Sequence, residues 1–223
     1  GQSGPHRISR FRDALAAKEE QFDGVDQQDA QEFADYLLTC LHEQLNRVRG
    51  GQRGGGHVGR LEGAMSAEQE ERAAEEQWAH SLQQEASIVT DVFQGQLRSQ
   101  IQCLRCGLVS RKFETFTCLS LPVVDAAGAP LSTLEQCFGE FSREEKLSGG
   151  ERWNCPRCRD RVDAAKVITL WRLPRVLIVH LKRFRFDAVP SPGGDGPSLL
   201  AYRARKLGHH VDFALRDLRL GPL

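Results

Sequence analysis

Hydrophobic positions in the first part of the chain recur with the period of a helix. Phe11 and Leu15 predict a short helix within residues 6–25. After the polar letters DGVD, a longer helix is predicted to begin at Asp26, because an aspartate side chain can cap a helix N-terminus. The apolar stripe of this second helix is Phe33, Leu37, Leu41, Leu45 and Val48. The pattern therefore predicts two helices before residue 49.

A glycine-rich segment, residues 49–66, follows the second helix. Its composition is typical of a flexible linker or a surface insertion. From Ser66 the letters SAEQ form a helix-capping pattern. Ala74, Trp78 and Leu82 then recur four positions apart, so we expect a helix over residues 67–88.

At about Val89 the period changes from helical to alternating. The letters FQGQLRSQIQ alternate apolar and polar residues, and FETFTCLSLPV does the same beyond the first cysteine pair. Such alternation on both sides of a short turn predicts a long antiparallel hairpin. Cys103 and Cys106 would lie at the tip of this hairpin.

The remainder of the chain predicts one helix and three strands. LSTLEQCFGEF is interpreted as the helix, and AAKVITLW, RVLIVHLKRFRF and HHVDFALRDL as the strands. The apolar run from Val176 to Leu181 has no polar interruption except His180. Such a run is typical of a strand that is central in a sheet and covered on both faces.

Four of the seven cysteines form two pairs with the spacing of metal ligands. Cys103 and Cys106 make one Cys-x-x-Cys pair, and Cys155 and Cys158 make the other. One tight turn can present both sulfurs of such a pair, and four thiolates satisfy Zn²⁺ in tetrahedral geometry. The pattern therefore predicts a structural zinc site, with no position left open for a substrate.

The two pairs differ in the residues of their turns. Gly107 follows the first pair and gives the backbone the freedom that a tight turn uses. Arg159 stands at the equivalent place after the second pair, and Pro156 stiffens that turn. Residues 107–154 separate the pairs, which is more than a simple zinc ribbon has. We therefore expect the two turns to come from separate hairpins.

Other interpretations of the cysteines are less favoured. An odd number of cysteines with two such pairs suits a reducing compartment better than a disulfide framework, so a cytoplasmic or nuclear location is expected. A redox pair needs a helix N-terminus after a strand, which neither pair has. Unrelated thiols remain an alternative. Cys40, Cys118 and Cys137 are interpreted as small core residues.

The charge balance bears on possible partners. The 30 Lys and Arg residues equal the 30 Asp and Glu residues, so no overall field attracts nucleic acid or a membrane surface. No apolar run approaches the ~20 residues that a membrane-spanning helix needs. We therefore expect neither nucleic-acid binding nor membrane insertion, and a zinc-ribbon nucleic-acid module is disfavoured. The locally basic letters HLKRFRF and RARKLGHH are interpreted as solvated surface.

The motifs QQDAQEF and LHEQLNR lie in the predicted second helix, FQGQLRSQIQCLRCG and FETFTCLSLPV flank the first cysteine pair, and CPRCRDRVDAAKVITLWRLPRVLIVHLKRFRFD begins at the second. In this order they resemble the ubiquitin-specific proteases, which are papain-like deubiquitinases of peptidase family C19. QQDAQEF with LHEQLNR resembles the thumb helix of that family, and FQGQLRSQIQCLRCG with FETFTCLSLPV is similar to the first half of its zinc-bearing fingers. CPRCRDRVDAAKVITLWRLPRVLIVHLKRFRFD resembles the second finger and the palm strand after it. FSREEKLSGGERWNCPRCRDR resembles the endosomal branch of the family most closely.

The resemblance implies an α+β fold of the papain-like hand type, with thumb helices, zinc-bearing β fingers and a β palm, truncated at both ends. Residues 1–223 would form a partial protease domain. Its parts would be thumb helices over 1–48, the glycine-rich linker over 49–66, a helix over 67–88, the fingers over 89–165 and palm strands over 166–223.

The resemblance also implies an activity and a partner. Members of the family cut the isopeptide bond after the C-terminal glycine of ubiquitin, with a thiolate nucleophile and a histidine base that an aspartate or asparagine orients. Gln27 and Asp29 would face the arginine-bearing tail of ubiquitin, and Asp29 would pair with an arginine. Asp29 also suits the positive end of a helix dipole, and the two roles can coexist.

The catalytic boxes of that family have no counterpart in these letters. Nothing resembles the Gly-Asn-Thr-Cys-Tyr box of the nucleophile, and the chain stops at LGPL before a Gly-His-Tyr box. His180, His209 and His210 receive no role in catalysis. We therefore expect the chain to be inactive alone, with a noncatalytic ubiquitin-binding module that carries structural zinc as the alternative function.

Overall fold

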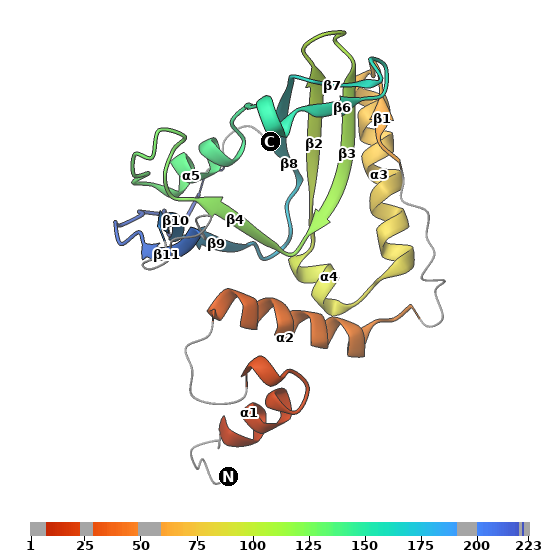
Figure 1. Cartoon of the computed structure of the whole chain (residues 1–223). Helices are drawn as coiled ribbons and strands as arrows, with labels where there is room; N and C mark the ends of the chain where they lie inside the picture. Colours follow the sequence, from red (N-terminus) through yellow and green to blue (C-terminus); the bar gives the residue numbers. More distant parts are fainter. Residues whose placement is uncertain (1–7, 23–28, 49–58, 191–199, 219, 221–223) are drawn as a thin grey trace. The chain divides into compact units, whose positions relative to one another are not determined.

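The computed structural model describes residues 8–22, 29–48, 59–190, 200–218 and 220. The chain divides into two compact units, residues 1–45 and residues 46–223, and each is described by itself. Both helices and strands are present in the described part, as Figure 1 shows, which confirms the mixed α+β class.

The first unit is helical. It contains α1 (Ile8–Ala16), the short 3-10 helix η1 (Glu20–Phe22) and α2 (Ala30–Leu45). The Phe22 ring lies 5.4 Å from the Phe33 ring and 5.5 Å from the Tyr36 ring, measured between centroids. These aromatic contacts join η1 to α2. The helix predicted around Phe11 and Leu15 is present as α1, but it is shorter than residues 6–25.

The predicted start of the second helix is wrong. Asp26 lies outside the described residues, and α2 begins at Ala30 after a non-helical Asp29. Oδ1 of Asp29 accepts the backbone N–H of Gln31 at 2.7 Å and that of Glu32 at 3.4 Å. An N-cap needs the side-chain oxygen to reach N–H groups two and three residues ahead, and Asp29 satisfies this condition for α2.

A five-stranded antiparallel sheet is the largest element of the second unit, and its order is β1-β3-β2-β8-β5. Its strands are β1 (Leu61–Glu62), β2 (Gly95–Cys103), β3 (Val109–Phe116), β5 (Glu145–Leu147) and β8 (Ala164–Arg172). The predicted hairpin with the first cysteine pair at its tip is present as β2 and β3. Its far arm is shorter than predicted, because it ends at Phe116 and Cys118–Pro122 form a separate strand.

Three two-stranded sheets complete the strands of the second unit. β4 (Cys118–Pro122) pairs in parallel with β9 (Ile178–Lys182). β6 (Trp153–Cys155) and β7 (Asp160–Val162) form a short hairpin, and so do β10 (Phe184–Pro190) and β11 (Leu200–Lys206). The helices are α3 (Ala67–Gln84), α4 (Ile88–Phe93), α5 (Leu134–Phe141) and the short η2 (Gly149–Glu151).

The main core of this unit lies between β4 and α5. Leu121, Val123 and Cys137 are fully buried there, and Phe138 is almost so. The predicted helix in LSTLEQCFGEF is confirmed as α5, which begins with a capping box between Thr133 and Gln136. Its apolar side chains at positions 134, 137 and 138 supply the face that packs on β4.

Four predictions for this unit need correction. The helix expected over 67–88 ends at Gln84, and residues 88–93 form α4 instead of the start of a strand, because Ser87 and Thr90 form a capping box. β9 is not central: within the described ranges it pairs with β4 alone, and Val176 before it is 48% exposed. HHVDFALRDL forms no strand, and β11 precedes it.

Helix α3 lies alongside β3 and β2 (Figure 1) and is held there by buried polar groups. The carboxylate of Glu70 lies 2.8 Å from Nη1 of Arg98 and 2.6 Å from Nε of Arg111. The Arg111 contact lacks the alignment of a hydrogen bond, so it is mainly Coulombic. Gln96, fully buried, donates from Nε2 to the backbone oxygen of Ala74 at 3.0 Å. These contacts fix α3 against the strands that carry the first cysteine pair.

Candidate metal centre in two cysteine hairpins

The four predicted cysteines come together although residues 107–154 separate the pairs. Cys103 and Cys106 lie at the turn between β2 and β3, and Cys155 and Cys158 at the turn between β6 and β7. Their Sγ atoms all lie within 4.8 Å of one another, and they form the one such cluster found among the described residues. Two separate hairpins thus present one set of donors, as the sequence predicted.

Both turns have the same backbone hydrogen bonds. The N–H of Cys106 donates to Sγ of Cys103 at 3.3 Å, and the N–H of Cys158 donates to Sγ of Cys155 at 3.4 Å. The N–H of Gly107 and that of Arg159 donate to the carbonyl oxygens of the first cysteines, at 3.0 and 2.8 Å. Each turn therefore aims both of its sulfurs at one point, and N–H groups support the charge on a thiolate.

The distances between the sulfurs suit a tetrahedral ion. The two sulfurs of Cys103 and Cys158 are 3.8 Å apart, and those of Cys106 and Cys155 are 3.7 Å apart. A Zn–S bond of about 2.3 Å in tetrahedral geometry places neighbouring sulfurs about 3.8 Å apart. A disulfide would need about 2.05 Å, so the cysteines are free thiols. The donor set fits a structural Zn²⁺, and zinc itself remains a prediction.

The surroundings shift the pKa values of two of these thiols in opposite directions. Burial raises the pKa of the Cys103 thiol, but N–H groups of Cys106 and Arg105 outweigh burial and bring this pKa to about 7. Burial together with the neighbouring thiols raises the pKa of Cys158 to about 12. The Cys103 thiol therefore ionises readily, whereas the Cys158 thiol resists ionisation next to the other sulfurs. A bound cation would remove this conflict, because it attracts all four thiolates.

Apolar side chains shield the cluster from water. Cys103 and Cys155 are buried, Cys106 and Cys158 are half-buried, and Leu108 and Val162 pack against them. A low-dielectric shell of this kind strengthens the attraction between an ion and its ligands. All four coordination positions would be filled by protein, so the site suits stabilisation and not catalysis.

Arg159 carries a backbone conformation that glycine adopts more easily. Its φ is +52°, and Gly107 in the equivalent place has φ +72°. We expect Arg159→Gly to raise the free energy of unfolding by about 1 kcal/mol, because the left-handed region costs a residue with a Cβ roughly that much. Urea denaturation at a fixed zinc concentration measures the change.

The matched variant is Gly107→Ala, in which a Cβ would meet no other atom within 4 Å. Any loss of stability in that variant therefore comes from the backbone conformation, and we expect the opposite sign to that of Arg159→Gly. Two variants that shift stability in the same direction would contradict this account of the turns.

The other predicted site residues, Gln27 and Asp29, belong to the first unit of the chain. Gln27 lies outside the described residues, and Asp29 is exposed at the N-terminus of α2. Among the remaining cysteines, Cys137 is fully buried in the core as predicted, while Cys40 and Cys118 are half-buried. A hydrogen bond with the Cys40 thiol raises the pKa of Tyr36 to about 12.

The histidines make structural contacts. Nδ1 of His180 lies 3.1 Å from Oγ of Ser120, which joins the paired strands β4 and β9. Nε2 of His209 lies 2.9 Å from the carbonyl oxygen of Val123, and Nε2 of His210 lies 2.9 Å from Oδ1 of Asp212. In the part of the chain that the structure describes, none of these histidines is within hydrogen-bonding distance of a cysteine thiol.

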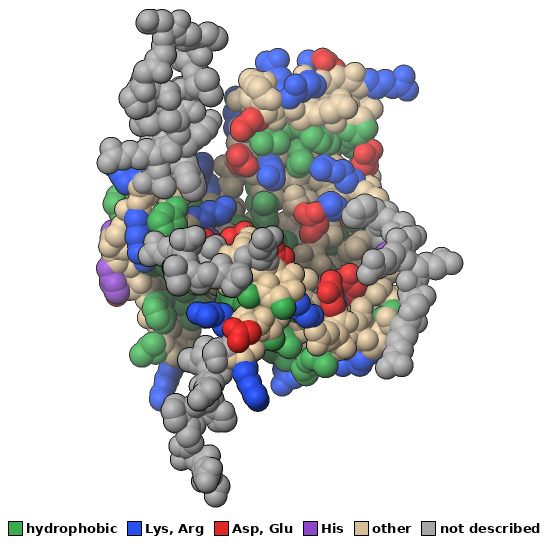
Figure 2. Space-filling model, turned by 60° about the horizontal axis from the view of Figure 1, so that its bottom comes forward, with side chains coloured by type: hydrophobic (Ala, Val, Ile, Leu, Met, Phe, Trp, Pro, Cys, Tyr) green, Lys and Arg blue, Asp and Glu red, His purple; other side chains and the backbone are tan. Residues whose placement is uncertain are grey.

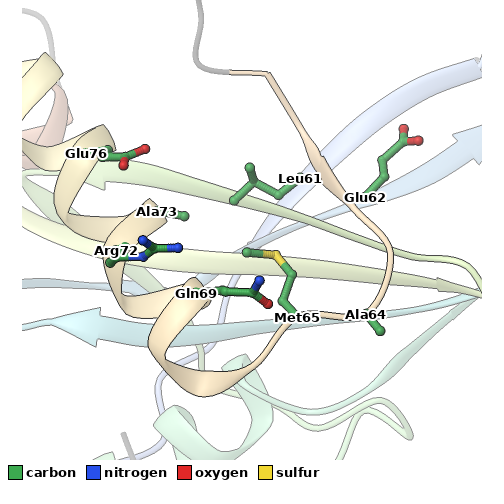
Figure 3. Close-up of a pocket in the computed structure, with 8 residues that line it drawn as sticks. All are labelled: Leu61, Glu62, Ala64, Met65, Gln69, Arg72, Ala73 and Glu76. Carbon is green, nitrogen blue, oxygen red and sulfur yellow. The ribbon is translucent and has the colours of Figure 1, made fainter.

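A separate hollow of about 310 Å³ lies between α3 and the segment that contains β1. Figure 3 shows Leu61 and Met65 pointing from that segment toward Ala73 on α3, with Arg72 and Glu76 nearby on the helix. These apolar side chains belong to the small core around Phe113. The hollow is therefore the open rim of this core, and it contains neither a nucleophile nor a metal-ligand set.

Sequence reasoning missed a second feature beside the cluster. Arg105, Lys146, Arg152 and Arg161 line one groove, although they come from three segments of the chain. The letters RCRDR around the second pair hinted at local positive charge, but the groove itself arises only from the fold.

No helix within the described ranges has both the length and the apolar character needed to cross a bilayer.

Solved structures with a similar fold are known. The SAGA DUB module of Ubp8, Sgf11, Sus1 and Sgf73 bound to monoubiquitin matches with a TM-score of 0.60 and 23% identity, over 93% of this chain and 36% of that chain. The same module bound to ubiquitin aldehyde matches with the same score and identity, over 93% and 35% of the two chains. At this identity the likeness shows the fold alone, and it agrees with the predicted hand.

Sequence comparison identifies relatives. Ubiquitin carboxyl-terminal hydrolase 2 of Homo sapiens is 35% identical over 212 residues, which cover 95% of this chain and 32% of that protein. Ubiquitin carboxyl-terminal hydrolase 4 of Saccharomyces cerevisiae is 36% identical over 181 residues, which cover 78% of this chain and 19% of that protein. The chain thus spans a third or less of the length of these relatives.

The family model described as ubiquitin carboxyl-terminal hydrolase matches residues 3–222, which is nearly the whole chain. This match includes both cysteine hairpins and helix α2. It agrees with the resemblance that the sequence motifs carry. The chain therefore belongs to the ubiquitin carboxyl-terminal hydrolase family.

Proposed function

We propose that this chain is part of the catalytic domain of a thiol-dependent deubiquitinase, which hydrolyses the isopeptide bond after the C-terminal glycine of ubiquitin. The convergence of the four cysteine sulfurs within 4.8 Å, inside a sequence that the family model matches almost completely, is the observation that carries this proposal. The chain would contribute the ubiquitin-gripping fingers and part of the tail channel.

The zinc ion has a structural role in this proposal. Cys103, Cys106, Cys155 and Cys158 would hold Zn²⁺, which ties the β6–β7 hairpin to the β2–β3 hairpin. Zinc supplies here only the bonds that hold two hairpins together. Four reduced thiols are needed as ligands, so we also propose a reducing compartment, the cytoplasm or the nucleus.

Asp29 supplies a carboxylate that can receive an arginine of the ubiquitin tail. Its Oδ1 accepts two N–H groups of α2, while Oδ2 accepts no hydrogen bond from any residue that the structure describes. The two N–H groups orient the side chain, and the positive end of the helix dipole favours negative charge at this position. A guanidinium could therefore bind Oδ2 without displacing the cap, and Gln27 would assist as an amide at the same turn.

The test is a titration of the purified chain with ubiquitin, followed by isothermal calorimetry. We expect saturable binding that Asp29→Asn weakens about three- to tenfold, since charge-assisted hydrogen bonds are roughly twice as strong as neutral ones. Asparagine caps helices as well as aspartate does, so this variant separates the charge from the cap. Asp29→Ala should lose both the cap and the binding.

If Asp29→Asn bound ubiquitin as tightly as the parent chain while Asp29→Ala bound weakly, the cap alone would matter and the tail contact would be refuted. A change in far-UV circular dichroism reports the state of α2 in each variant. Absence of saturable binding in the parent chain would contradict the proposed function of the fingers.

The same preparation tests catalysis. We expect cleavage of a ubiquitin–fluorophore conjugate no faster than in buffer, because the letters contain neither the Gly-Asn-Thr-Cys-Tyr nor the Gly-His-Tyr box. A deubiquitinase of known activity serves as the positive control. Binding without cleavage would fit both a piece of a protease and the alternative noncatalytic module, and measurable turnover would overturn the assignment of absent catalytic residues.

A further inference from the structure

A groove of about 400 Å³ lies beside the candidate metal centre and is strongly basic. Four cations line it, namely Arg105, Lys146, Arg152 and Arg161, against the single carboxylate of Asp163. The chain as a whole is electrically neutral, so this balance is local. Figure 2 shows Lys and Arg side chains gathered at the upper right of that view, with few Asp and Glu side chains among them.

Two of the four cations in this groove, Lys146 and Arg161, form no ion pair with a carboxylate of the described residues. Arg161 donates from Nη2 to the carbonyl oxygens of Gly150 at 2.7 Å and Arg152 at 3.4 Å, which orients the guanidinium but leaves its charge intact. No carboxylate of the described residues forms an ion pair with Lys146. The adjacent Glu145 pairs instead with Lys166, with 3.7 Å between Oε2 and Nζ. Two cations are therefore available to a ligand.

The other two cations are held by exposed ion pairs. Arg105 contacts Asp160 and Arg152 contacts Asp163, each at 2.8 Å, and both arginine side chains are more than half exposed. Exposed pairs of this kind are weak because water screens both charges, so a carboxylate of a partner can replace the internal one at little cost.

The groove also has an apolar strip. Leu104 is 53% exposed at the tip of the β2–β3 hairpin, and Val162, which also lines the groove, is almost fully buried. The backbone N–H of Leu104 donates to the carbonyl oxygen of Asp163 at 3.0 Å, which fixes the strip between the two cysteine hairpins. An aliphatic side chain of a ligand could cover Leu104 while the surrounding cations bind acidic groups.

We propose that this groove is a docking surface for an acidic, extended segment of a protein partner, with an aliphatic residue between carboxylates. Nucleic acid fits less well, because no aromatic side chain lines the groove to stack on bases and the basic surface is short. The surface does not involve Asp29, so it stands independently of ubiquitin-tail binding.

The test is fluorescence anisotropy of the whole chain with a fluorescein-labelled peptide that has a central leucine flanked by aspartates and glutamates. We expect saturable binding that falls when the salt concentration is raised tenfold. The amide analogue, with asparagine and glutamine in place of the acids, should bind at least tenfold more weakly, since it lacks the charges.

Variants locate the site on the chain. Lys146→Glu should weaken binding about five- to tenfold, since reversal both removes an attraction and adds a repulsion. Leu104→Ser should weaken it about threefold, since partial exposure of the side chain limits the apolar contact. Lys206→Glu makes the same change of charge on β11, away from the groove, and should leave binding unchanged.

Three results would overturn the proposal. One is equal binding of the acidic peptide and its amide analogue. The second is equal weakening by Lys146→Glu and Lys206→Glu, which would show attraction by bulk charge only. The third is tighter binding of a single-stranded oligonucleotide of the same charge, which would identify a nucleic-acid surface instead. Circular dichroism and the zinc content of each variant show that the fold is retained.

Discussion

Replacing Cys155 with serine is expected to abolish stoichiometric zinc binding and to unfold the β6–β7 hairpin. Cys155 is fully buried, and its sulfur lies 3.7 Å from that of Cys106. Apparent binding free energies of structural zinc in small domains are on the order of 10 kcal/mol, and most of that supports folding. Serine cannot supply a thiolate, so the variant loses one of four ligands and leaves three coupled thiols without a full shell.

The measurement combines zinc analysis with thermal unfolding of the chain. The parent should contain one zinc per chain and Cys155→Ser close to none, with a midpoint lower by more than about 10 °C, since 1 kcal/mol corresponds to several degrees in a domain of this size. Cys118→Ser is the matched control, because this half-buried cysteine lies outside the cluster. Equal zinc content in Cys155→Ser and the parent chain would refute the assigned site.

Removal of the Glu70 carboxylate should cost about 3 kcal/mol of unfolding free energy, because it leaves two partly buried guanidinium groups without their counter-charge. Glu70 is 9% exposed and contacts both Arg98 and Arg111. The estimate is at the low end for buried pairs because the Arg98 side chain is 26% exposed and retains some water. Urea denaturation of Glu70→Ala at constant zinc measures the loss.

Glu75 offers a control on the same helix. It also pairs with an arginine, Arg172, but its side chain is 59% exposed. Glu75→Ala should therefore cost less than about 1 kcal/mol, as exposed ion pairs do. Similar losses for the two variants would mean that helix propensity or overall charge, and not burial of the Glu70 group, governs the result.

The sequence was sufficient to predict the turn at each cysteine pair because the spacing within a pair is local, and the ligand number of Zn²⁺ then predicted that the two pairs meet. Cys-x-x-Cys with a following glycine constrains one turn, and alternation on either side constrains the strands that lead to it. The sequence also indicated that Arg159 occupies a glycine-like place, and its φ of +52° agrees. These inferences depend on a few consecutive residues and on stereochemistry that holds in any fold.

The errors concern long-range pairing. The apolar run at Val176–Leu181 favoured a central strand, but Leu177, Val179 and Leu181 pack against the core from one side and β9 pairs with β4 alone among the described strands. The basic groove was missed for the same reason, because its cations approach one another only after the hairpins are joined. Periodicity reports which residues are apolar, and it carries no information on which partner covers them.

The parallel pairing of β4 with β9 has a kinetic consequence. Cys118 aligns with Ile178, so the second cysteine hairpin and α5 lie within the loop that this pair closes. Closing so long a loop costs conformational entropy and slows folding. A zinc ion that joins the two cysteine hairpins would shorten the loop that remains to be closed. Refolding should therefore be faster when zinc is present from the outset than when it is added last, which stopped-flow fluorescence can determine.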